Sequence, residues 1–350
     1  ENLHFETFEP RLLLSADLIP IQGALEVPGE SDSYSFTLAE QKTIYFDSQT
    51  NAPNFRWTLD GPAGNVVNSR DFRSSDSVDI AGSAVLELQP GDYNLSIDGV
   101  GEVTGEYQFR LLDLANAASL DLGTQVDEAF ENSTQTDLYQ FHAEAGDKIF
   151  LDREALSGST PYMRLLDPDH QTLFQQTLFN DVDTLTLNKT GVYSFMMEGR
   201  IYDTSPADYA FTIHSVTDDE STLVVNDLVA GRIDIPGQRD RYSFNLAQDQ
   251  RLYFDSLTAR TDVKWSLSGP NGNIVSNRQL YYSDSYWANP ALDLLAGDYV
   301  LTVDADGGVI ADYGFRLLSA TSAETIALDN NVTGILDDAG YFSSQVRTTE

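Results

Sequence analysis

The chain of 350 residues contains no cysteine, and it has only 20 basic side chains against 55 acidic ones. The absence of cysteine excludes disulfides, thiolate chemistry and zinc sites built on sulfur. The acidic excess gives a formal net charge of -35, which repels nucleic acid and anionic lipid surfaces. No apolar run approaches the roughly 18 residues of a membrane span. We therefore expect neither a nucleic-acid partner nor membrane insertion.

Signatures of catalysis are also absent. The four histidines are scattered, without the His-x-x-x-His spacing of a zinc protease helix. The sequence has no Gly-x-Ser-x-Gly elbow, no phosphate-binding glycine loop and no dinucleotide fingerprint after a strand. Carboxylates are so frequent that two of them close in sequence say little about glycosidase chemistry. We predict that the protein is not an enzyme.

What the sequence does contain is a repeat with a period of about one hundred residues. GALEVPGESDSYSFTLAEQKTIYFDS, starting at Gly23, returns as GRIDIPGQRDRYSFNLAQDQRLYFDS, starting at Gly231, and a diverged copy lies between them. Residues 321–350 read either as the start of an incomplete fourth unit or as a tail that pairs with something else. The predicted boundaries are an N-terminal segment at 1–16 and three repeats at 17–116, 117–217 and 218–320.

Alternating apolar positions predict that the repeats are made of strands. In the first repeat Tyr34, Phe36 and Leu38 fall on one face, and the serines and threonine between them fall on the other. Trp57 and Trp265 occupy matching positions in alternating strands beside a Gly-Pro-x-Gly turn, so we expect both in the core. The recurring Tyr93, Tyr193 and Tyr299 are expected to pack their rings and to bond local backbone through their hydroxyls. The predicted fold is all-β, a tandem array of jelly-roll-like antiparallel β-sandwiches of about 100 residues each.

These motifs resemble the bacterial pre-peptidase C-terminal domain family. The first repeat carries its D-x-Y-x-F strand at residues 32–36, its L-x-G-P-x-G turn at 59–64, its G-x-Y strand at 91–93 and its closing Y-x-F strand at 107–109. The third repeat carries all of them, and the middle one departs from the pattern. The resemblance implies β-sandwiches of the kind found in secreted proteases and surface proteins, some of which bind calcium, collagen or polysaccharide.

The N-terminal stretch FETFEPRLLLSAD is similar to the Leu-Glu-Pro-Arg-x-Leu-Leu element near the N-termini of very large bacterial surface or adhesin-like proteins, with Phe8 in place of the first leucine. That resemblance implies an extracellular or cell-surface location. The alternative interpretation is a plain apolar strand, in which Leu12, Leu13 and Leu14 pack against a neighbouring sheet.

Two places are candidate sites. Asp304 and Asp306 alternate in a glycine-rich turn, which suits calcium, the one cofactor that the pattern suggests, or a simple polar β-turn. The stretch FRSSDSVD of the first repeat becomes LYYSDSYW in the third. Its aromatic side chains suit stacking on a surface glycan, a protein interface or a contact between repeats. They are Tyr281, Tyr282, Tyr286 and Trp287.

The leading functional hypothesis is a non-catalytic extracellular structural or adhesion module, the N-terminal repeat array of a larger bacterial surface or secreted protein. Its expected partners are downstream domains or other copies of itself. In one alternative, the extended N-terminal segment of one chain, with its apolar residues 12–14, completes the unfinished fourth unit of the next, and a filament grows by β-strand addition. In the other alternative, the array is a ligand-binding accessory module of a secreted hydrolase.

Overall fold

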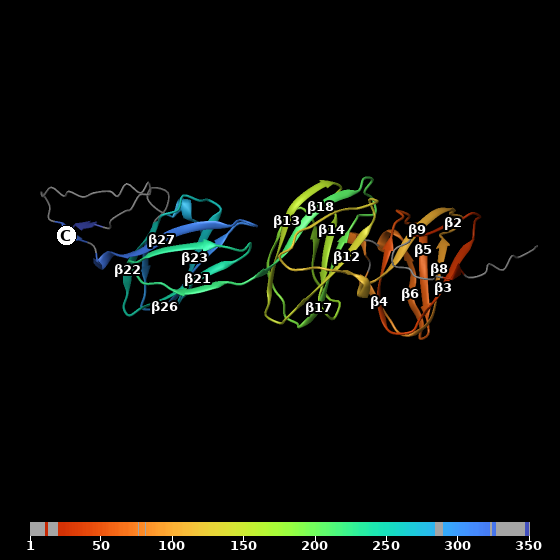
Figure 1. Ribbon diagram of the computed structural model, residues 1–350, viewed down its shortest axis with the longest axis horizontal. Helices are drawn as coiled ribbons and strands as arrows, with labels where there is room; N and C mark the ends of the chain where they lie inside the picture. Colours follow the sequence, from red (N-terminus) through yellow and green to blue (C-terminus); the bar gives the residue numbers. More distant parts are fainter. Residues whose placement is uncertain are drawn as a thin grey trace, which may run out of the picture. The chain divides into compact units, whose positions relative to one another are not determined.

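The structure, a computed structural model, describes residues 11–12, 20–75, 77–80, 82–283, 290–322, 324–326 and 347–349. Within these ranges the chain is built almost wholly from β-strands, with short 3-10 turns between some of them. The strands form three β-sandwiches in succession, coloured red to orange, yellow to green and cyan to blue in Figure 1. The prediction of an all-β chain of tandem sandwiches is confirmed.

The first sandwich pairs a five-stranded sheet, in the order β1-β3-β8-β5-β6, with a four-stranded sheet, in the order β2-β9-β4-β7. Its elements are β1 (Arg11–Leu12), β2 (Ile21–Leu25), β3 (Ser31–Leu38), β4 (Lys42–Ser48), β5 (Phe55–Gly61), β6 (Gly64–Asp71), η1 (Arg73–Ser75), η2 (Ser77–Asp79), β7 (Val85–Leu88), β8 (Gly91–Gly99), β9 (Gly105–Asp113) and η3 (Leu114–Asn116).

The second sandwich repeats this arrangement, with sheets in the orders β10-β12-β17-β14-β15 and β11-β18-β13-β16. Its strands are β10 (Ala118–Ser119), β11 (Val126–Ala129), β12 (Thr136–Ala143), β13 (Lys148–Gly158), β14 (Tyr162–Leu166), β15 (Thr172–Thr177), β16 (Val182–Thr186), β17 (Gly191–Glu198) and β18 (Ala207–Val216).

The third sandwich has sheets in the orders β19-β21-β26-β23-β24 and β20-β27-β22-β25. Its elements are β19 (Asp219–Thr222), β20 (Leu228–Ile233), β21 (Arg239–Leu246), β22 (Gln250–Ser256), β23 (Val263–Gly269), β24 (Gly272–Gln279), η4 (Leu280–Tyr282), β25 (Ala291–Leu294), β26 (Gly297–Ala305), β27 (Ala311–Ser319) and η6 (Ala320–Ser322). A two-stranded pair of β28 (Glu324–Ile326) and β29 (Arg347–Thr349) follows.

A short parallel strand forms one edge of each five-stranded sheet. β1 pairs with β3, β10 with β12 and β19 with β21, and the other described pairs within the sandwiches are antiparallel. The sequence predicts only antiparallel sheets, so this edge strand is an addition to the predicted fold. β1 lies within the N-terminal segment 1–16, and the structure thus joins part of that segment to the first sandwich. β28 pairs with β29 in the same parallel way.

The core of each sandwich comes from the inward positions of its alternating strands. Trp57 and Trp265 are both fully buried, as predicted, and each stacks on a phenylalanine of the opposite sheet. The ring centroids of Trp57 and Phe46 lie 4.0 Å apart, and those of Trp265 and Phe254 lie 3.8 Å apart. Such large buried aromatic areas supply much of the stability of a fold without disulfides.

The three recurring tyrosines behave as predicted. The hydroxyl of Tyr93 donates to the carbonyl of Gln89 at 2.7 Å, and the hydroxyl of Tyr193 donates to that of Lys189 at 2.6 Å. The hydroxyl of Tyr299 donates to the carbonyl of Leu295 at 2.7 Å. Each bond ties a buried ring to the turn that precedes its own strand, so these tyrosines are structural.

The chain divides into two compact units. The first unit comprises Glu1–Gly146, Arg153–Asn180 and Leu187–Thr212, so it contains the first sandwich and most of the second. The second unit comprises Asp147–Asp152, Asp181–Thr186 and Ile213–Glu350, so it contains the third sandwich. No helix among the described residues is long and apolar enough to cross a membrane.

Candidate functional site

Each sandwich contains the same group of two tyrosines and one aspartate between its sheets, buried or partly buried. In the second sandwich the Tyr209 hydroxyl donates to Asp137 Oδ2 at 2.7 Å, and the hydroxyls of Tyr139 and Tyr209 lie 2.8 Å apart. Asp137 and Tyr139 come from β12, and Tyr209 comes from β18 of the opposite sheet. The counterparts are Asp32, Tyr34 and Tyr107 in the first sandwich and Asp240, Tyr242 and Tyr313 in the third.

The chemistry of this group is structural. Burial raises the pKa of Tyr107, Tyr209 and Tyr313, with their acidic and tyrosine neighbours adding to the rise, so each stays protonated and donates to its aspartate. An aspartate at the start of a strand commonly caps a nearby backbone amide. The structure instead gives them tyrosine hydroxyls from the opposite sheet, and the group holds the two sheets together.

A second recurring feature is a fully buried aspartate on the four-stranded sheet. In the first sandwich Arg110 Nε donates to Asp47 Oδ2 at 2.6 Å, and in the third Arg316 Nη2 donates to Asp255 Oδ2 at 2.6 Å. Both carboxylates are completely buried. A buried aspartate of this kind needs its cation, because an uncompensated charge inside a protein is very unfavourable.

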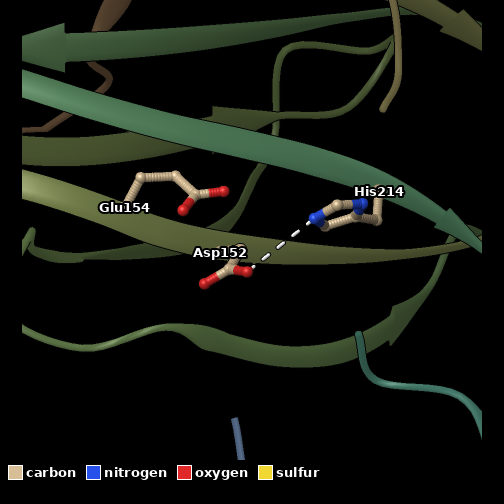
Figure 2. Close-up of side chains that lie close together, drawn as sticks. All are labelled: Asp152, Glu154 and His214. Atoms are coloured by element: carbon tan, nitrogen blue, oxygen red, sulfur yellow. Dashed lines mark ion pairs between the residues drawn. The ribbon is translucent and has the colours of Figure 1, made fainter. Parts of the chain in front are cut away.

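The second sandwich carries a variant of this pair, shown in Figure 2. Asp152 occupies the place of Asp47, and Thr212 replaces the arginine. His214 Nε2 lies 3.8 Å from Asp152 Oδ2, and Thr212 Oγ1 donates to Glu154 Oε1 at 3.2 Å.

Among the described residues, Asp152, Glu154 and His214 are the one group of acidic and histidine side chains whose ligand atoms converge, within 4.8 Å of one another. They stand on the neighbouring strands β13 and β18, and they are the residues in this part of the chain that offer a set of metal ligands. Asp152 occupies the place of Asp47, so the repeat accounts for its position without a metal.

In the first unit, the Asp47 and Arg110 pair also holds the second sandwich. Thr136, at the start of β12, donates its hydroxyl to Asp47 Oδ1 at 2.9 Å. Arg110 Nη2 in turn donates to the carbonyl oxygen of Thr136 at 2.8 Å. Burial raises the pKa of Asp47, and Arg110, Thr136 and Gln49 oppose that rise. The ion pair of one sandwich is thus completed by the backbone and side chain of the next.

A second buried ion pair lies at the same junction. Arg164 Nε, on β14, donates to Glu198 Oε1 of β17 at 3.0 Å, and Arg164 Nη2 donates to the Ser77 carbonyl of the first sandwich at 2.9 Å. Arg164 also donates to Gln175. Glu198 is completely buried and Arg164 is 4% exposed. Burial raises the pKa of Glu198, Arg164 opposes the rise and the charge of Asp47 adds to it, so the two ion pairs influence each other.

An apolar cluster also joins the two sandwiches. It combines side chains of the first sandwich with Leu166 and Met196 of the second, and Leu138 packs against it. At the rim, His170 Nδ1 lies 3.1 Å from Glu87 Oε1, and the Arg73 guanidinium lies over the ring of Tyr202. The members from the first sandwich are Tyr45, Val85, Leu112 and Leu114.

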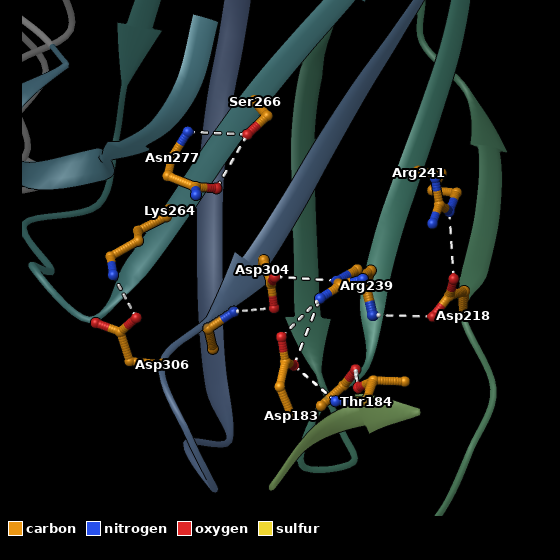
Figure 3. Close-up of polar contacts among 12 residues, drawn as sticks. Asp183, Thr184, Asp218, Arg239, Arg241, Lys264, Ser266, Asn277, Asp304 and Asp306 are labelled. Atoms are coloured by element: carbon orange, nitrogen blue, oxygen red, sulfur yellow. Dashed lines mark hydrogen bonds and ion pairs between the residues drawn. The ribbon is translucent and has the colours of Figure 1, made fainter. Parts of the chain in front are cut away.

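In the second unit, a polar notch of about 440 Å³ lies over the outer face of the five-stranded sheet of the third sandwich, as Figure 3 shows. Arg239 Nε donates to Asp304 Oδ2 at 3.0 Å, and Arg239 Nη2 lies 3.3 Å from Asp183 Oδ2. Arg241 Nε donates to Asp218 Oδ2 at 3.2 Å. The three basic side chains of the notch are Arg239, Arg241 and Lys264, and each has a carboxylate partner.

The predicted calcium residues lie at this notch. Asp304 accepts from Arg239 and from the Ala305 amide, and Asp306 forms an ion pair with Lys264. The backbone amide of Asp306 donates to the carbonyl of Asp262. Burial raises the pKa of Asp304, and Arg239 opposes that rise. The two carboxylates are thus held by separate cations of the protein.

Of the four predicted aromatic residues, the structure describes two. Tyr281 and Tyr282 lie on η4, are 47% and 42% exposed, and meet edge to face with ring centroids 4.8 Å apart. Tyr286 and Trp287 lie outside the described residues. Leu12 belongs to β1 and pairs with Ser35 of its own chain, whereas Leu13 and Leu14 also lie outside the described residues.

The residues of the junction are those that sequence reasoning missed. A signal for Asp47 is present, because the aspartate of YFDS recurs as Asp255 in the third repeat. The signal for Arg164 and Glu198 is a loss of alternation, because β14 is buried at every position and β17 at its last six. A strand buried on both faces must be covered on both, which here means by another sandwich.

No family model matches the chain, and no curated protein matches it. Among solved structures, it is similar to a periplasmic inhibitor of g-type lysozyme from Aeromonas hydrophila, with 15% identity over 28% of this chain and 96% of that one, at a TM-score of 0.23. It is also similar to the CUB1-EGF-CUB2 domains of rat MASP-1, with 7% identity over 59% of this chain and 100% of that one, at a TM-score of 0.21. The corresponding domains of human MASP-1/3 give 9% identity over 55% and 99%, at a TM-score of 0.18. Scores this low carry no argument about fold or function.

Proposed function

We propose that this chain is a non-catalytic structural module, a tandem β-sandwich array of a larger bacterial surface or secreted protein. In such an array, the sandwiches act by being coupled to one another and by presenting surfaces for contact. The observation that supports it is the junction in the first unit, where an apolar cluster and two buried ion pairs join successive sandwiches. The extracellular setting follows from the two family resemblances in the sequence.

The junction has the character of a permanent interface. Successive domains in a chain that move freely usually meet through small and polar contacts. Here Arg110, Arg164, Asp47 and Glu198 are removed from water together with the apolar cluster. Separating the sandwiches would expose that cluster and would break the contacts of Thr136 and Ser77, so the two are expected to unfold together.

The experiment is hydrogen exchange read by mass spectrometry over a series of denaturant concentrations. Peptides from β8 and from β17 are expected to exchange with the same opening free energy in the wild-type chain. Leu112→Asp places a charge in the apolar cluster and is expected to separate the two values. Leu228→Asp is the control, because Leu228 is 62% exposed. Different opening free energies in the wild-type chain, unchanged by Leu112→Asp, would contradict a coupled array.

A second candidate function, the ligand-binding accessory module, is favoured by the tyrosine pair on η4. Two exposed aromatic rings side by side suit stacking on sugar rings. The test is binding to a panel of neutral oligosaccharides by the wild-type chain and by Tyr281→Ala with Tyr282→Ala. Binding that is lost in the double variant supports this function, and no binding by the wild-type chain removes it.

A further inference from the structure

The outer face of the four-stranded sheet in the third sandwich repeats the face by which the first sandwich holds the second. We call the residues Tyr253, Asp255, Arg316 and Leu318 the third-sandwich face. They stand on β22 and β27 at the places that Tyr45, Asp47, Arg110 and Leu112 occupy on β4 and β9. The pairing is the same, because Tyr45 lies opposite Leu112 and Tyr253 lies opposite Leu318.

In the first sandwich this set of residues is covered. Tyr45 is completely buried and Leu112 is 5% exposed, both within the apolar cluster of the junction. The Arg110 side chain is 11% exposed, whereas that of Arg316 is 26% exposed. Tyr253 and Leu318 are only partly buried. The third-sandwich face thus has the same kinds of residue as the junction, but its side chains are less buried.

The chain also leaves the two sandwiches in the same way. After β9, η3 is followed by β10, which pairs in parallel with β12, the strand that brings Thr136 and Leu138 to the junction. After β27, η6 is followed by β28, which pairs in parallel with β29. The connection that delivers the second sandwich onto the first therefore recurs after the third.

We infer that the third-sandwich face is a docking surface for the strand pair of β28 and β29, which opens a fourth repeat and sits on the third sandwich as β10 and β12 sit on the first. The inference rests on the proposed function, since it assumes that successive sandwiches are joined face to face. Arg316 would donate to a backbone carbonyl of the incoming strand, and Asp255 would accept from a hydroxyl of it, as Arg110 and Asp47 do with Thr136.

The test uses the absence of cysteine, which makes any introduced thiol the only one in the chain. Leu318→Cys is made in the full chain of 350 residues and in a chain that ends at residue 322, and the rate of maleimide labelling is compared. The shorter chain keeps the whole buried core of the third sandwich, which runs from Leu223 to Leu317. We expect labelling to be several-fold slower in the full chain than in the shorter one.

Tyr253→Cys serves as a second variant if Leu318→Cys fails to fold by circular dichroism, and the same result is expected for it. Val27→Cys, at a 59% exposed position of the first sandwich, is the control and should label fast in both chain lengths. Equal rates at position 318 in both lengths would overturn the inference. Slow labelling of the shorter chain that depends on protein concentration would also overturn it, because a second copy would then be the occupant.

Leu112→Cys separates this inference from the proposed function. Its labelling should be slow in both chain lengths, because the second sandwich covers it. Fast labelling at position 112 would count against the coupled array itself. Slow labelling at 112 together with equal rates at 318 would overturn the docking of β28 and β29 alone.

Discussion

Tyr209 and Asp137 are joined by a hydrogen bond of 2.7 Å that runs between the two sheets of the second sandwich. The first and third sandwiches contain the same bond, from Tyr107 to Asp32 and from Tyr313 to Asp240. A polar bond between two sheets fixes how they face each other, because polar groups shielded from water must meet a partner. Each repeat therefore has its own hydrogen bond that holds its two sheets together.

Replacing Tyr209 by phenylalanine should destabilise the second sandwich. Tyr209→Phe keeps the ring but leaves Asp137 and Tyr139 without the shared hydroxyl, and a buried polar group without its partner costs about 1–3 kcal/mol. The free energy of unfolding from urea titration measures the loss. Tyr281→Phe is the matched control on an exposed ring and should leave that free energy unchanged. Equal effects of the two substitutions would contradict a stabilising role for the hydrogen bond between the sheets.

The ion pair of Arg164 and Glu198 should show strong coupling. Arg164→Met or Glu198→Leu alone leaves one buried charge without its partner, which costs about 3–5 kcal/mol. The double variant removes both charges, so it should be clearly more stable than the sum of the single losses predicts. The free energies of unfolding of the four chains form the double-mutant cycle. Additive losses would show that the two side chains do not act as a pair.

Acid should weaken the contacts of Asp218. Burial acts to raise the pKa of Asp218, but Lys148 and Arg241 together hold it below its ordinary value of 3.8. A carboxyl whose pKa is lower in the folded state stabilises the fold above the unfolded value, and that contribution is lost as the pH falls through the folded pKa. Between pH 5 and pH 2, the free energy of unfolding of Asp218→Asn should therefore fall less than that of the wild-type chain. The difference should be about the contribution of a single carboxyl whose pKa is shifted by folding.

The measurement for Asp218 is the free energy of unfolding by urea at several pH values. Asp127→Asn is the matched control, because Asp127 is exposed on β11. It should follow the wild-type pH dependence. A steeper fall in acid for Asp218→Asn than for the wild-type chain would show that the sign is wrong.

Calcium should have no effect on stability through the turn of Asp304 and Asp306. Their carboxylates are held by Arg239 and Lys264, so an ion would have to displace two cations of the protein. The melting temperature is expected to be the same in excess calcium and in excess chelator, because a ligand stabilises only the state that it binds. A higher melting temperature in calcium would contradict this expectation, and its loss in Asp306→Asn would place the ion at this turn.

The interior of each sandwich could be predicted well from the sequence. Trp57, Trp265 and the recurring Tyr93 stand in strands that alternate between apolar and polar residues, and alternation reports which face is buried. Alternate side chains of a strand point to the same face, so Asp32 lies on the same face as Tyr34 and its burial could have been predicted. The buried position of Asp32 was not predicted because an aspartate at the beginning of a strand usually caps a backbone amide.

The junction could not be predicted in the same way, because it depends on contacts between repeats. Arg164 and Met196 lie on the outer face of their sheet, where sequence reasoning expects water. Divergence of the middle repeat was visible, but nothing in its residues says which neighbour covers them. The partner of Arg164 in the first sandwich is moreover the backbone carbonyl of Ser77. Every residue has such a carbonyl, so the sequence does not identify this one as a partner.

The mismatch between neighbouring repeats also bears on how the chain folds. The strands β3 and β21 share the pattern D-x-Y-S-F-x-L, and β12 lies between them in the chain with Leu138 where they have Ser33 and Arg241. Tandem domains misfold when a strand of one inserts into its neighbour. A β3 inserted in place of β12 would bring Ser33 into an apolar junction, and a β12 in place of β3 would expose Leu138. The two similar strands, β3 and β21, thus belong to sandwiches that are separated by the second one. This separation disfavours the exchange of strands between adjacent sandwiches as they fold.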